Sequence, residues 1–134
     1  MNLIDEFLAQ GPWAVIGTSK DRSKYGNKVQ RAYMQRGMKV HPVHPGGEPI
    51  EGLPTVRSLT ELPEPVHGLS IITPPPITER VVEDAARAGI RYLWMQPGAE
   101  SQRAIQRAEE LGLKVIHSGP CILVKLRYRE DPEP

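Results

Sequence analysis

Glycine, hydroxyl and basic residues gather in one short segment near the start of the chain, between an apolar run and a helical run. After the apolar run 13–16 come Gly17, Thr18, Ser19, Lys20, Arg22 and Lys24, and the helical run opens with Tyr25 and Gly26. A helix N-terminus offers unpaired N–H groups and about half a positive charge, and glycine lets an anion reach the backbone. Hydroxyl groups add donors, and Lys and Arg add cations. The segment therefore predicts a phosphate-binding turn.

An ordinary connection between a strand and a helix also favours Gly and Ser, so the glycines alone do not distinguish a phosphate-binding turn from a purely structural one. The basic side chains Lys20, Arg22 and Lys24 favour the anion site, because a structural turn does not need them. Over the whole chain, Lys+Arg 17 against Asp+Glu 16 leaves a net charge of +1. This balance provides no global field for nucleic acid or an anionic membrane, so we expect an anion to be held locally.

Length and composition predict a single domain over residues 1–134. No apolar run approaches the ~20 residues of a membrane span, and the N-terminus lacks a charged region followed by an apolar segment. The single cysteine excludes an internal disulfide framework. We therefore expect a cytoplasmic protein with no membrane partner. Fourteen prolines beside two asparagines resemble the composition of heat-adapted proteins.

Alternating apolar runs and amphipathic segments predict an α/β fold, a Rossmann-like, doubly wound parallel sheet of about five strands with helices on both faces. The expected strands cover 13–17, 39–43, 69–73, 91–96 and 113–117. The expected helices cover 3–10, 26–36, 77–88 and 99–111. Three of them end at Gly37, Gly89 and Gly112, because glycine in the left-handed conformation commonly ends a helix.

Residues three and four apart define the faces that these helices are expected to bury. The faces are Ile4, Phe7 and Leu8; Val29, Ala32 and Tyr33; Ile77, Val81, Val82, Ala85 and Ala88; and Ala104, Ile105, Ala108 and Leu111. The Gly- and Pro-rich interval 44–68 predicts irregular structure, with an extended piece at 53–56 and one helical turn opened by a capping-box pattern at 58–61. The charged tail from about Tyr128 is expected to be loose.

Residues suited to binding also follow the other expected strands. In an open parallel sheet, ligands bind beyond the carboxyl ends of the strands, where the strand order reverses. Proline after a strand often only ends it, but it also forms a rigid apolar wall for a flat ring or a linear acyl arm. All five ends carry Gly or Pro, which favours one shared cleft. The ends after the first are His44-Pro45-Gly46-Gly47, Thr73-Pro74-Pro75-Pro76, Gln96-Pro97-Gly98 and Ser118-Gly119-Pro120-Cys121, and Pro76 is expected to begin the helix that follows it.

The residues after the first two strands also indicate which class of nucleotide could bind. The usual dinucleotide fingerprint is Gly-x-Gly-x-x-Gly, with an acidic residue at the end of the second strand for the ribose 2′-hydroxyl. Here Gly17 is followed by Gly26, and His44 follows the second strand. NAD is therefore disfavoured, whereas a ligand with an extra ribose phosphate fits. An NAD(P)-binding oxidoreductase or nucleotide-sensing domain stays open as the alternative, as does an interaction protein that has lost its ligand.

The combined motifs resemble the small bacterial CoA-binding proteins, which are similar to the N-terminal domain of the succinyl-CoA synthetase alpha subunit. The resemblance extends over about 13–126 and rests on the segments 16–19, 25–26, 40–45, 72–75 and 94–98. It implies a Rossmann-like domain that binds coenzyme A or an acyl-CoA, with the pyrophosphate on Gly17, Thr18 and Ser19. It also implies adenine near Val43, His44 and Pro45, and a pantetheine arm that passes Thr73, Pro74 and Pro75 toward Gln96, Pro97 and Gly98.

The chain departs from the synthetase pattern in two ways. The synthetase-type domain has a lysine soon after the proline of the second strand, and this chain has Gly46 and Gly47 there. Lys20, Arg22 or Lys24 would then have to hold the ribose 3′-phosphate. The phosphorylated histidine of the synthetase belongs to another domain, so no ligase activity is carried over. We expect a non-catalytic CoA-binding module, and the sequence does not identify any acyl-transfer enzyme as its partner.

Other candidate groups are few. Cys121 is either a small buried apolar residue or a thiol close to the thiol of bound CoA, able to form a mixed disulfide under oxidation. The histidines at 41, 44, 67 and 117 lack metal-ligand spacing, so no metal site is expected. No nucleophile with a matching base can be singled out.

Overall fold

Five short apolar runs form a parallel sheet in the computed structural model, which describes residues 2–130. The strands lie in the order β2-β1-β3-β4-β5. They are β1 (Trp13–Ile16), β2 (Val40–Val43), β3 (Gly68–Ile71), β4 (Tyr92–Met95) and β5 (Lys114–Ile116). The predicted α/β fold is confirmed, and each predicted strand agrees to within two residues at either end.

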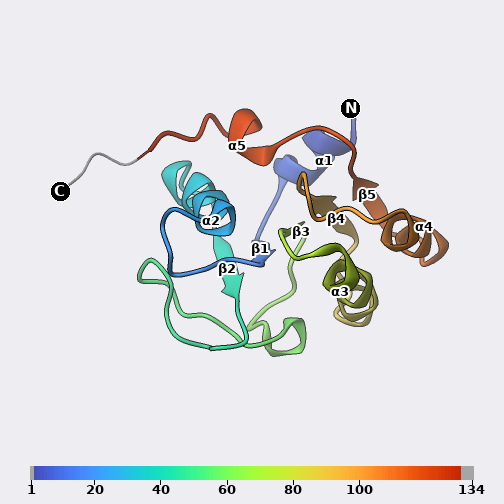
Figure 1. Ribbon diagram of the computed structural model, residues 1–134, viewed down its shortest axis with the longest axis horizontal. Helices are drawn as coiled ribbons and strands as arrows, with labels where there is room; N and C mark the ends of the chain where they lie inside the picture. The colour runs from blue at the N-terminus through green and yellow to red at the C-terminus, as the bar shows by residue number, and fades with distance from the viewer. Residues whose placement is uncertain (1, 131–134) are drawn as a thin grey trace.

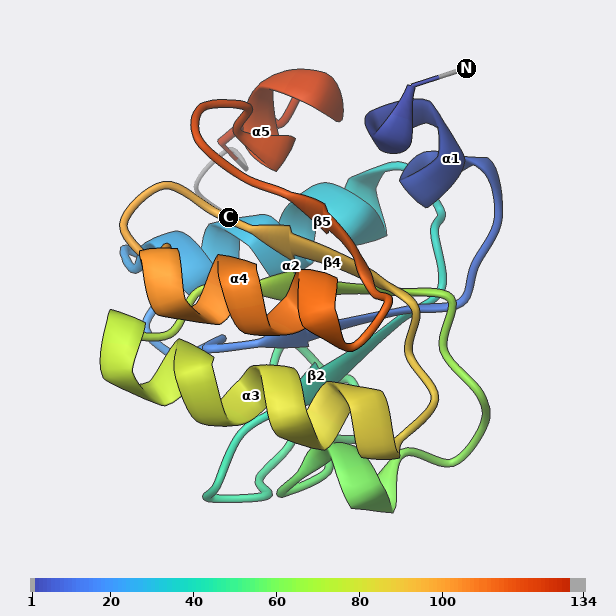
Figure 2. The ribbon, with the colours of Figure 1, turned by 90° about the vertical axis from the view of Figure 1, so that its right-hand side faces the viewer.

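Helices cover both faces of the sheet (Figure 1). On one face lie α1 (Leu3–Ala9), α2 (Tyr25–Gln35) and α5 (Ile122–Lys125), and on the other lie α3 (Pro75–Arg87) and α4 (Gln102–Glu110). Figure 2 shows α3 and α4 side by side in front of the strands. A 3-10 turn, η1 (Leu59–Glu61), precedes β3. No described helix is long and apolar enough to cross a membrane.

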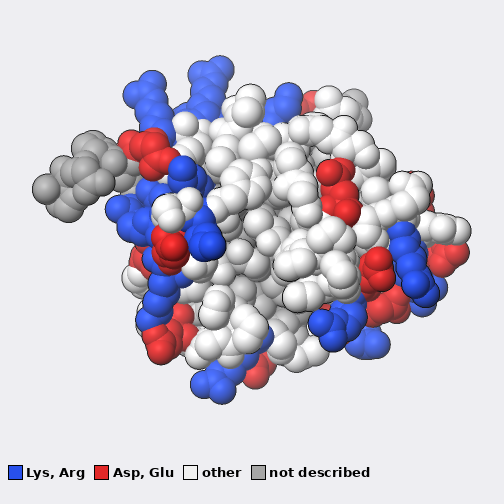
Figure 3. Space-filling model, viewed as in Figure 1, with Lys and Arg blue, Asp and Glu red and all other residues white. Residues whose placement is uncertain are grey.

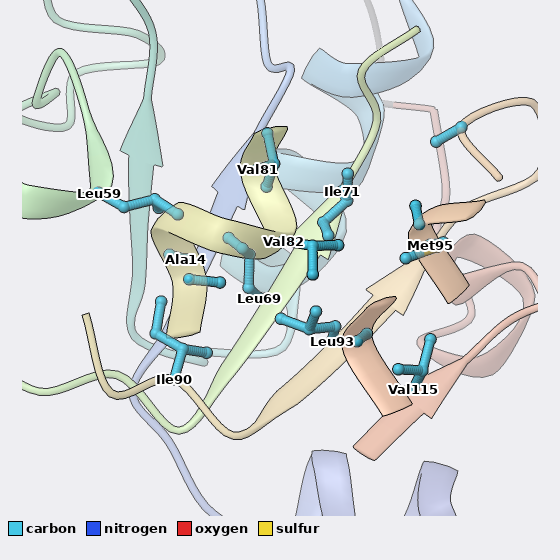
Figure 4. Packing of buried hydrophobic residues seen from close by; sticks show 14 of the residues in the cluster. Ala14, Leu59, Leu69, Ile71, Val81, Val82, Ile90, Leu93, Met95 and Val115 are labelled. Atoms are coloured by element: carbon cyan, nitrogen blue, oxygen red, sulfur yellow. The ribbon is translucent and has the colours of Figure 1, made fainter. Parts of the chain in front are cut away.

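Strand side chains alternate between two cores, because successive residues of a strand point to opposite faces. Figure 4 shows the core under α3, where Leu69, Ile71, Leu93 and Met95 from neighbouring strands pack against Val82, and all five are at most 1% exposed. The core under α1, α2 and α5 holds Phe7, Trp13, Val15, Val29, Ala32, Tyr33, Trp94, Ile116 and Ile122. Both faces of the sheet are buried, which explains why its strands are apolar runs.

The predicted helix ends and buried faces are confirmed with one main exception. Gly37, Gly89 and Gly112 have φ of 67°, 77° and 78°, as helix terminators do. The third main helix, however, begins at Pro75 rather than at 77, with Pro74 as its N-cap. Proline loses no hydrogen bond in the first turn and brings the right φ. The side chain of Ile77 is 39% exposed, and Thr78 is buried instead.

The other helix starts differ for local reasons. α4 begins at Gln102 instead of 99, because the Ser101 hydroxyl caps it by accepting from the Ala104 N–H at 2.9 Å. The predicted turn at 58–61 is present as η1, but the expected capping box is not formed. The Glu61 carboxylate accepts from the Arg57 N–H at 3.0 Å instead. The predicted extended piece at 53–56 joins isolated bridges at both of its ends, to Ile50 and Val43.

The predicted loose tail from Tyr128 begins in a segment that the structure describes as far as Glu130. Residues 126–130 lie along α2 and are held by both backbone and side chains. Gln35 exchanges two hydrogen bonds with the Arg129 backbone, at 2.6 and 3.1 Å. The Arg36 Nε donates to the Leu126 carbonyl at 2.6 Å, and Lys28 pairs with Glu130 at 2.7 Å. The last four residues of the expected tail, 131–134, lie outside the described residues.

Candidate functional site at the carboxyl ends of the strands

Strand register brings the predicted site residues to one rim. Ile16 is paired with both Val43 and Ile71, and Ile71 is paired with Met95. Because these are the last residues of β1 to β4, the residues that follow them start at the same height. In Figure 1 the loops after β1, β3 and β4 face the viewer, on the side where ligands bind in open α/β sheets. The strand order reverses between β1 and β3, which makes the turn after β1 the centre of this rim.

The turn after β1 packs against two neighbours so closely that only glycine fits. Gly17 has φ of 98°, and a Cβ there would lie 2.5 Å from the Ile72 carbonyl oxygen. A Cβ on Gly26, in the first turn of α2, would overlap the Gly17 carbonyl oxygen and lie 3.0 Å from the Thr18 Cα. The two glycines named from the sequence thus join the end of β1, the end of β3 and the start of α2.

The first turn of α2 has no side-chain cap, and two of its residues, Gly26 and Asn27, are buried. Its N-cap is Lys24, which makes no side-chain capping hydrogen bond, and the first turn contains no acidic residue. The first N–H groups of a helix have no intrahelical partner, so an external acceptor can bind them. The carbonyl groups of the loop are meanwhile directed to α2. Asn27 Nδ2 donates to the Ser19 carbonyl at 2.7 Å, and Arg31 donates to the Arg22 carbonyl at 2.7 Å.

A buried chain of hydrogen bonds holds this turn from beneath. The Thr18 hydroxyl donates to Gln30 Oε1 at 2.7 Å, and Gln30 Nε2 donates to the Ile50 carbonyl at 3.0 Å. Thr18 is 3% exposed, so its hydroxyl proton is used inside the protein. Asn27, Gln30 and Arg31 support the turn, and sequence reasoning missed all three. Their signal was a set of polar residues three and four apart, alongside the apolar face of the same helix.

Ion pairs neutralise two of the cations beside the turn. The Lys20 ammonium pairs with the Glu48 carboxylate. The Arg22 Nε lies 3.2 Å from the Glu51 carboxylate, which also accepts from Asn27 at 3.2 Å. Both acids come from the loop after β2, and a bound phosphate would compete with them. Within the loop, hydrogen bonds from Ser23 hold the pKa of Asp21 below its usual range, so this residue is anionic.

The loop after β2 forms a small cavity next to the turn. The cavity has a volume of about 170 Å³ and is lined by Lys20, His44, Gly46, Glu48 and Ile50. The His44 Nδ1 accepts from the Gly46 N–H at 2.9 Å, so a neutral ring carries its proton on Nε2 and can donate there. Val43, which the adenine was expected to approach, is 1% exposed and points into the core under α3.

Arg57 is a further cation at this loop that sequence reasoning missed. A Cβ on Gly47 would lie 2.6 Å from the Arg57 Nε, so the guanidinium group lies against this second glycine of the pair. Arg57 is exposed, and no ion pair to it is found among the described residues. Its position after an irregular, Pro-rich stretch gave no periodic signal that could have placed it there.

The predicted site residues that follow β3 and β4 differ in how exposed they are. Pro74, Pro97 and Gly98 are exposed, and Pro75 is partly buried. Thr73 is 8% exposed, and its hydroxyl bonds that of Thr78 at 2.7 Å, which supports the start of α3. Gln96 is completely buried. Figure 3 shows that the middle of this face is largely uncharged, with Lys, Arg, Asp and Glu mainly at its flanks.

A larger groove, of about 560 Å³, lies on the outer face of α3 and α4. It is lined by side chains of both charges, and Arg107 pairs with Glu83 there at 2.6 Å. This groove holds none of the predicted site residues, so we place the candidate site at the rim.

Comparison with protein families identifies the class to which the chain belongs. A profile of the CoA binding domain family matches residues 12–127. The chain belongs to the CoA binding domain family. This finding confirms the predicted resemblance, including the relation to synthetase-type CoA-binding domains.

Several known proteins are similar to this CoA-binding domain. It is 26% identical over 132 residues to the alpha subunit of acetate–CoA ligase (ADP-forming) II of Pyrococcus furiosus. That alignment covers 90% of this chain but 28% of the ligase subunit, so the chain spans under a third of that relative. The uncharacterized protein YneT of Bacillus subtilis is 26% identical over 103 residues, which are 77% of this chain and 76% of YneT.

A solved structure of similar size gives a strong match. It is a conserved hypothetical protein from Pyrococcus furiosus, 38% identical, with a TM-score of 0.80. The match covers 84% of this chain and 97% of that protein. Proteins that consist of little more than this domain therefore exist among its relatives, beside the longer ligase subunits.

Proposed function

We propose that this chain binds coenzyme A or an acyl-CoA without itself catalysing a reaction. The diphosphate of CoA would lie on the turn Gly17–Ser19, against the first turn of α2. The adenine would lie beside His44 and Pro45, and the pantetheine arm would pass Pro74 and Pro75 toward Pro97 and Gly98. The observation that carries this proposal is the uncapped first turn of α2, packed against Gly17 while the loop carbonyls are bonded away from it.

Membership of the CoA binding domain family supports the choice of ligand over other anions. The largely uncharged middle of the rim in Figure 3 suits the neutral pantetheine chain, and the cations at its flank suit the phosphates. The alternative of an NAD(P)-binding domain receives no such support, because His44 stands where an acidic residue would hold the ribose hydroxyl.

Isothermal titration calorimetry with CoA, dephospho-CoA, NADH and NADPH tests the proposal directly. We expect CoA to bind and the nicotinamide cofactors to give no heat. At 100 times its dissociation constant, CoA should stabilise the protein by ~2.7 kcal/mol, which a melting curve detects. Absence of heat with every adenine cofactor would refute the proposal.

The ribose 3′-phosphate distinguishes the candidate cations. If Arg57 binds this phosphate, Arg57→Ala weakens CoA binding by roughly 5- to 50-fold and leaves dephospho-CoA binding unchanged. If Arg22 binds the diphosphate, Arg22→Ala weakens both ligands alike. Arg103→Ala, an exposed arginine on α4, is the matched control and should change neither affinity. Equal CoA affinity in Arg57→Ala would remove that residue from the site.

A further inference from the structure

Three segments of the chain meet at the thiol of Cys121. Its Sγ lies 2.8 Å from the hydroxyl of Tyr25, in the first turn of α2. The same hydroxyl donates to Gln96 Oε1 at 3.1 Å, just after β4. The N–H of Ile122, at the start of α5, donates to this amide oxygen at 3.0 Å. The thiol is thus tied to the helix that begins at the proposed phosphate turn and to the rim where the pantetheine arm would end.

The side-chain NH₂ of Gln96 has no hydrogen-bond partner within the described protein. Gln96 is 0% exposed, and its Nε2 is the one buried side-chain polar atom without a hydrogen bond among the described residues. Buried donors are nearly always hydrogen-bonded in folded proteins, because an unpaired one loses its bonds to water without replacement. This NH₂ belongs to the same amide group whose oxygen accepts from Tyr25, and Tyr25 in turn contacts Cys121. Tyr25 and Cys121 are only partly buried.

A ligand that satisfies both groups has an amide carbonyl close to a sulfur. The carbonyl would accept from Gln96 Nε2, and the sulfur would lie against Cys121. The arm of coenzyme A has this chemistry, since its amide groups lead to a terminal thiol. We infer that Cys121 is a site of reversible covalent attachment, at which CoA is held as a mixed disulfide. This inference rests on the proposed function and adds a covalent state to it.

The reaction is thiol–disulfide exchange with CoA disulfide as the oxidant. The Cys121 thiolate attacks one sulfur of the CoA–S–S–CoA bond, a Cys121–S–S–CoA bond forms, and the S–S bond between the two CoA groups breaks. One CoA leaves as a thiolate and takes up the proton that Cys121 has lost. The Cys121 sulfur is oxidised, the departing sulfur is reduced, and no further reactant is needed.

Tyr25 is suited to assist this exchange as a positioning residue. Burial and the hydrogen bond with Cys121 raise the pKa of its phenol well above the usual range. The phenol therefore stays protonated and can donate to the sulfur when the thiol has lost its proton. In the free protein the hydroxyl instead donates to Gln96, which keeps the thiol in its place.

The experiment follows the intact mass of the full chain after incubation with CoA disulfide. We expect one CoA per chain, formed at least tenfold faster than the glutathione adduct under equal glutathione disulfide. Cys121→Ser should give no adduct. Gln96→Met should slow the reaction with CoA disulfide by a larger factor than the reaction with glutathione disulfide. Titration of Cys121→Ser with reduced CoA measures non-covalent binding separately.

Each outcome has a distinct meaning. No CoA adduct, in a protein that binds reduced CoA by calorimetry, overturns this inference and leaves the proposed function standing. Equal rates with CoA and glutathione disulfides also overturn it, because an exposed thiol without a site reacts in that way. Equal rates together with no calorimetric binding of CoA would defeat both proposals.

Discussion

The Gly26→Ala substitution tests the central feature of the proposed site. Gly26 lies inside α2, where alanine is intrinsically the better helix former by about 0.5–1 kcal/mol. Propensity alone therefore predicts that the variant is more stable. In the structure, however, a Cβ at this position overlaps the Gly17 carbonyl oxygen and lies 2.9 Å from the Gly17 carbonyl carbon. The two effects have opposite signs, so the measurement distinguishes them.

The magnitude follows from the contacts. The tighter contact is with the Gly17 carbonyl oxygen, and relieving it requires α2 to move from the turn by about 1 Å or more. The atoms on both sides belong to the backbone, and overpacking of this kind costs about 1–3 kcal/mol. After the gain in propensity is subtracted, we expect Gly26→Ala to lose roughly 1–2 kcal/mol of stability. The same shift separates the N–H groups of α2 from the diphosphate, and one lost hydrogen bond to a charged group weakens binding ~10- to 100-fold.

Calorimetry gives both numbers, the melting temperature without ligand and the dissociation constant of CoA. Gly37→Ala is the matched control, because it alters the opposite end of the same helix. Gly37 has φ of 67°, and a Cβ added there would meet nothing within 4 Å, so alanine is strained by ~1–2 kcal/mol without a clash. The control should lose similar stability and keep its affinity for CoA. A Gly26→Ala protein that melts at a higher temperature and binds CoA normally would refute the reasoning.

Three further predictions test the surroundings of the site and the fold. Glu51→Gln removes the carboxylate that competes for Arg22 and should tighten CoA binding by ~2- to 5-fold, an effect that shrinks in high salt; weaker binding in a titration would contradict it. The hydrogen bond from Tyr92, followed by that from Lys114, lowers the pKa of the Glu6 carboxyl, so the contribution of Glu6 to stability is present above pH 4.5 and is lost as the pH falls further. Glu6→Gln should therefore have a lower melting temperature than the unmodified protein at pH 7, and the two melting temperatures should converge near pH ~3. A difference that stays constant with pH would exclude this. Val82→Ala should cost about 1.5–3 kcal/mol in urea unfolding and Ile77→Ala less than ~1, because Val82 is 0% exposed and Ile77 is 39% exposed; the reverse order would show that Ile77, and not Val82, packs in the core.

The strand positions were predictable because both faces of the sheet are buried. Runs such as 13–16 and 92–95 are apolar throughout, and the glycines at 37, 89 and 112 mark where each preceding helix ends. The start of α3 was not predictable, because three consecutive prolines fit the first turn of a helix equally well in more than one register. The short helix α5 lies in a segment whose few residues give no periodic pattern, and its position depends on contacts with Gln96 and Trp94.

The location of the candidate site followed from the sequence, but its internal bonding did not. Gly17 and Gly26 were identifiable as local backbone requirements. The partners of Lys20 and Arg22 come from a Pro-rich loop about 28 residues further on, and no local rule places such a loop. Thr18 and Thr73 are typical hydroxyl donors in a sequence, yet both are used inside the fold. Such long-range pairings depend on tertiary structure, which the pattern of one chain does not contain.

The contacts of residues 126–130 with α2 couple the C-terminal end of that helix to the candidate site at its N-terminal end. The bonds from Gln35 and Arg36 hold the C-terminal half of α2, while Tyr25 and Gly26 at its other end contact the rim. Local opening of a packed segment raises the mobility of whatever it was restraining. Under the proposed function, removal of this segment by a protease, an antibody or a neighbouring protein is therefore expected to weaken CoA binding from more than two helical turns' distance. Communication of this kind needs no second binding pocket, because a single rigid helix transmits it.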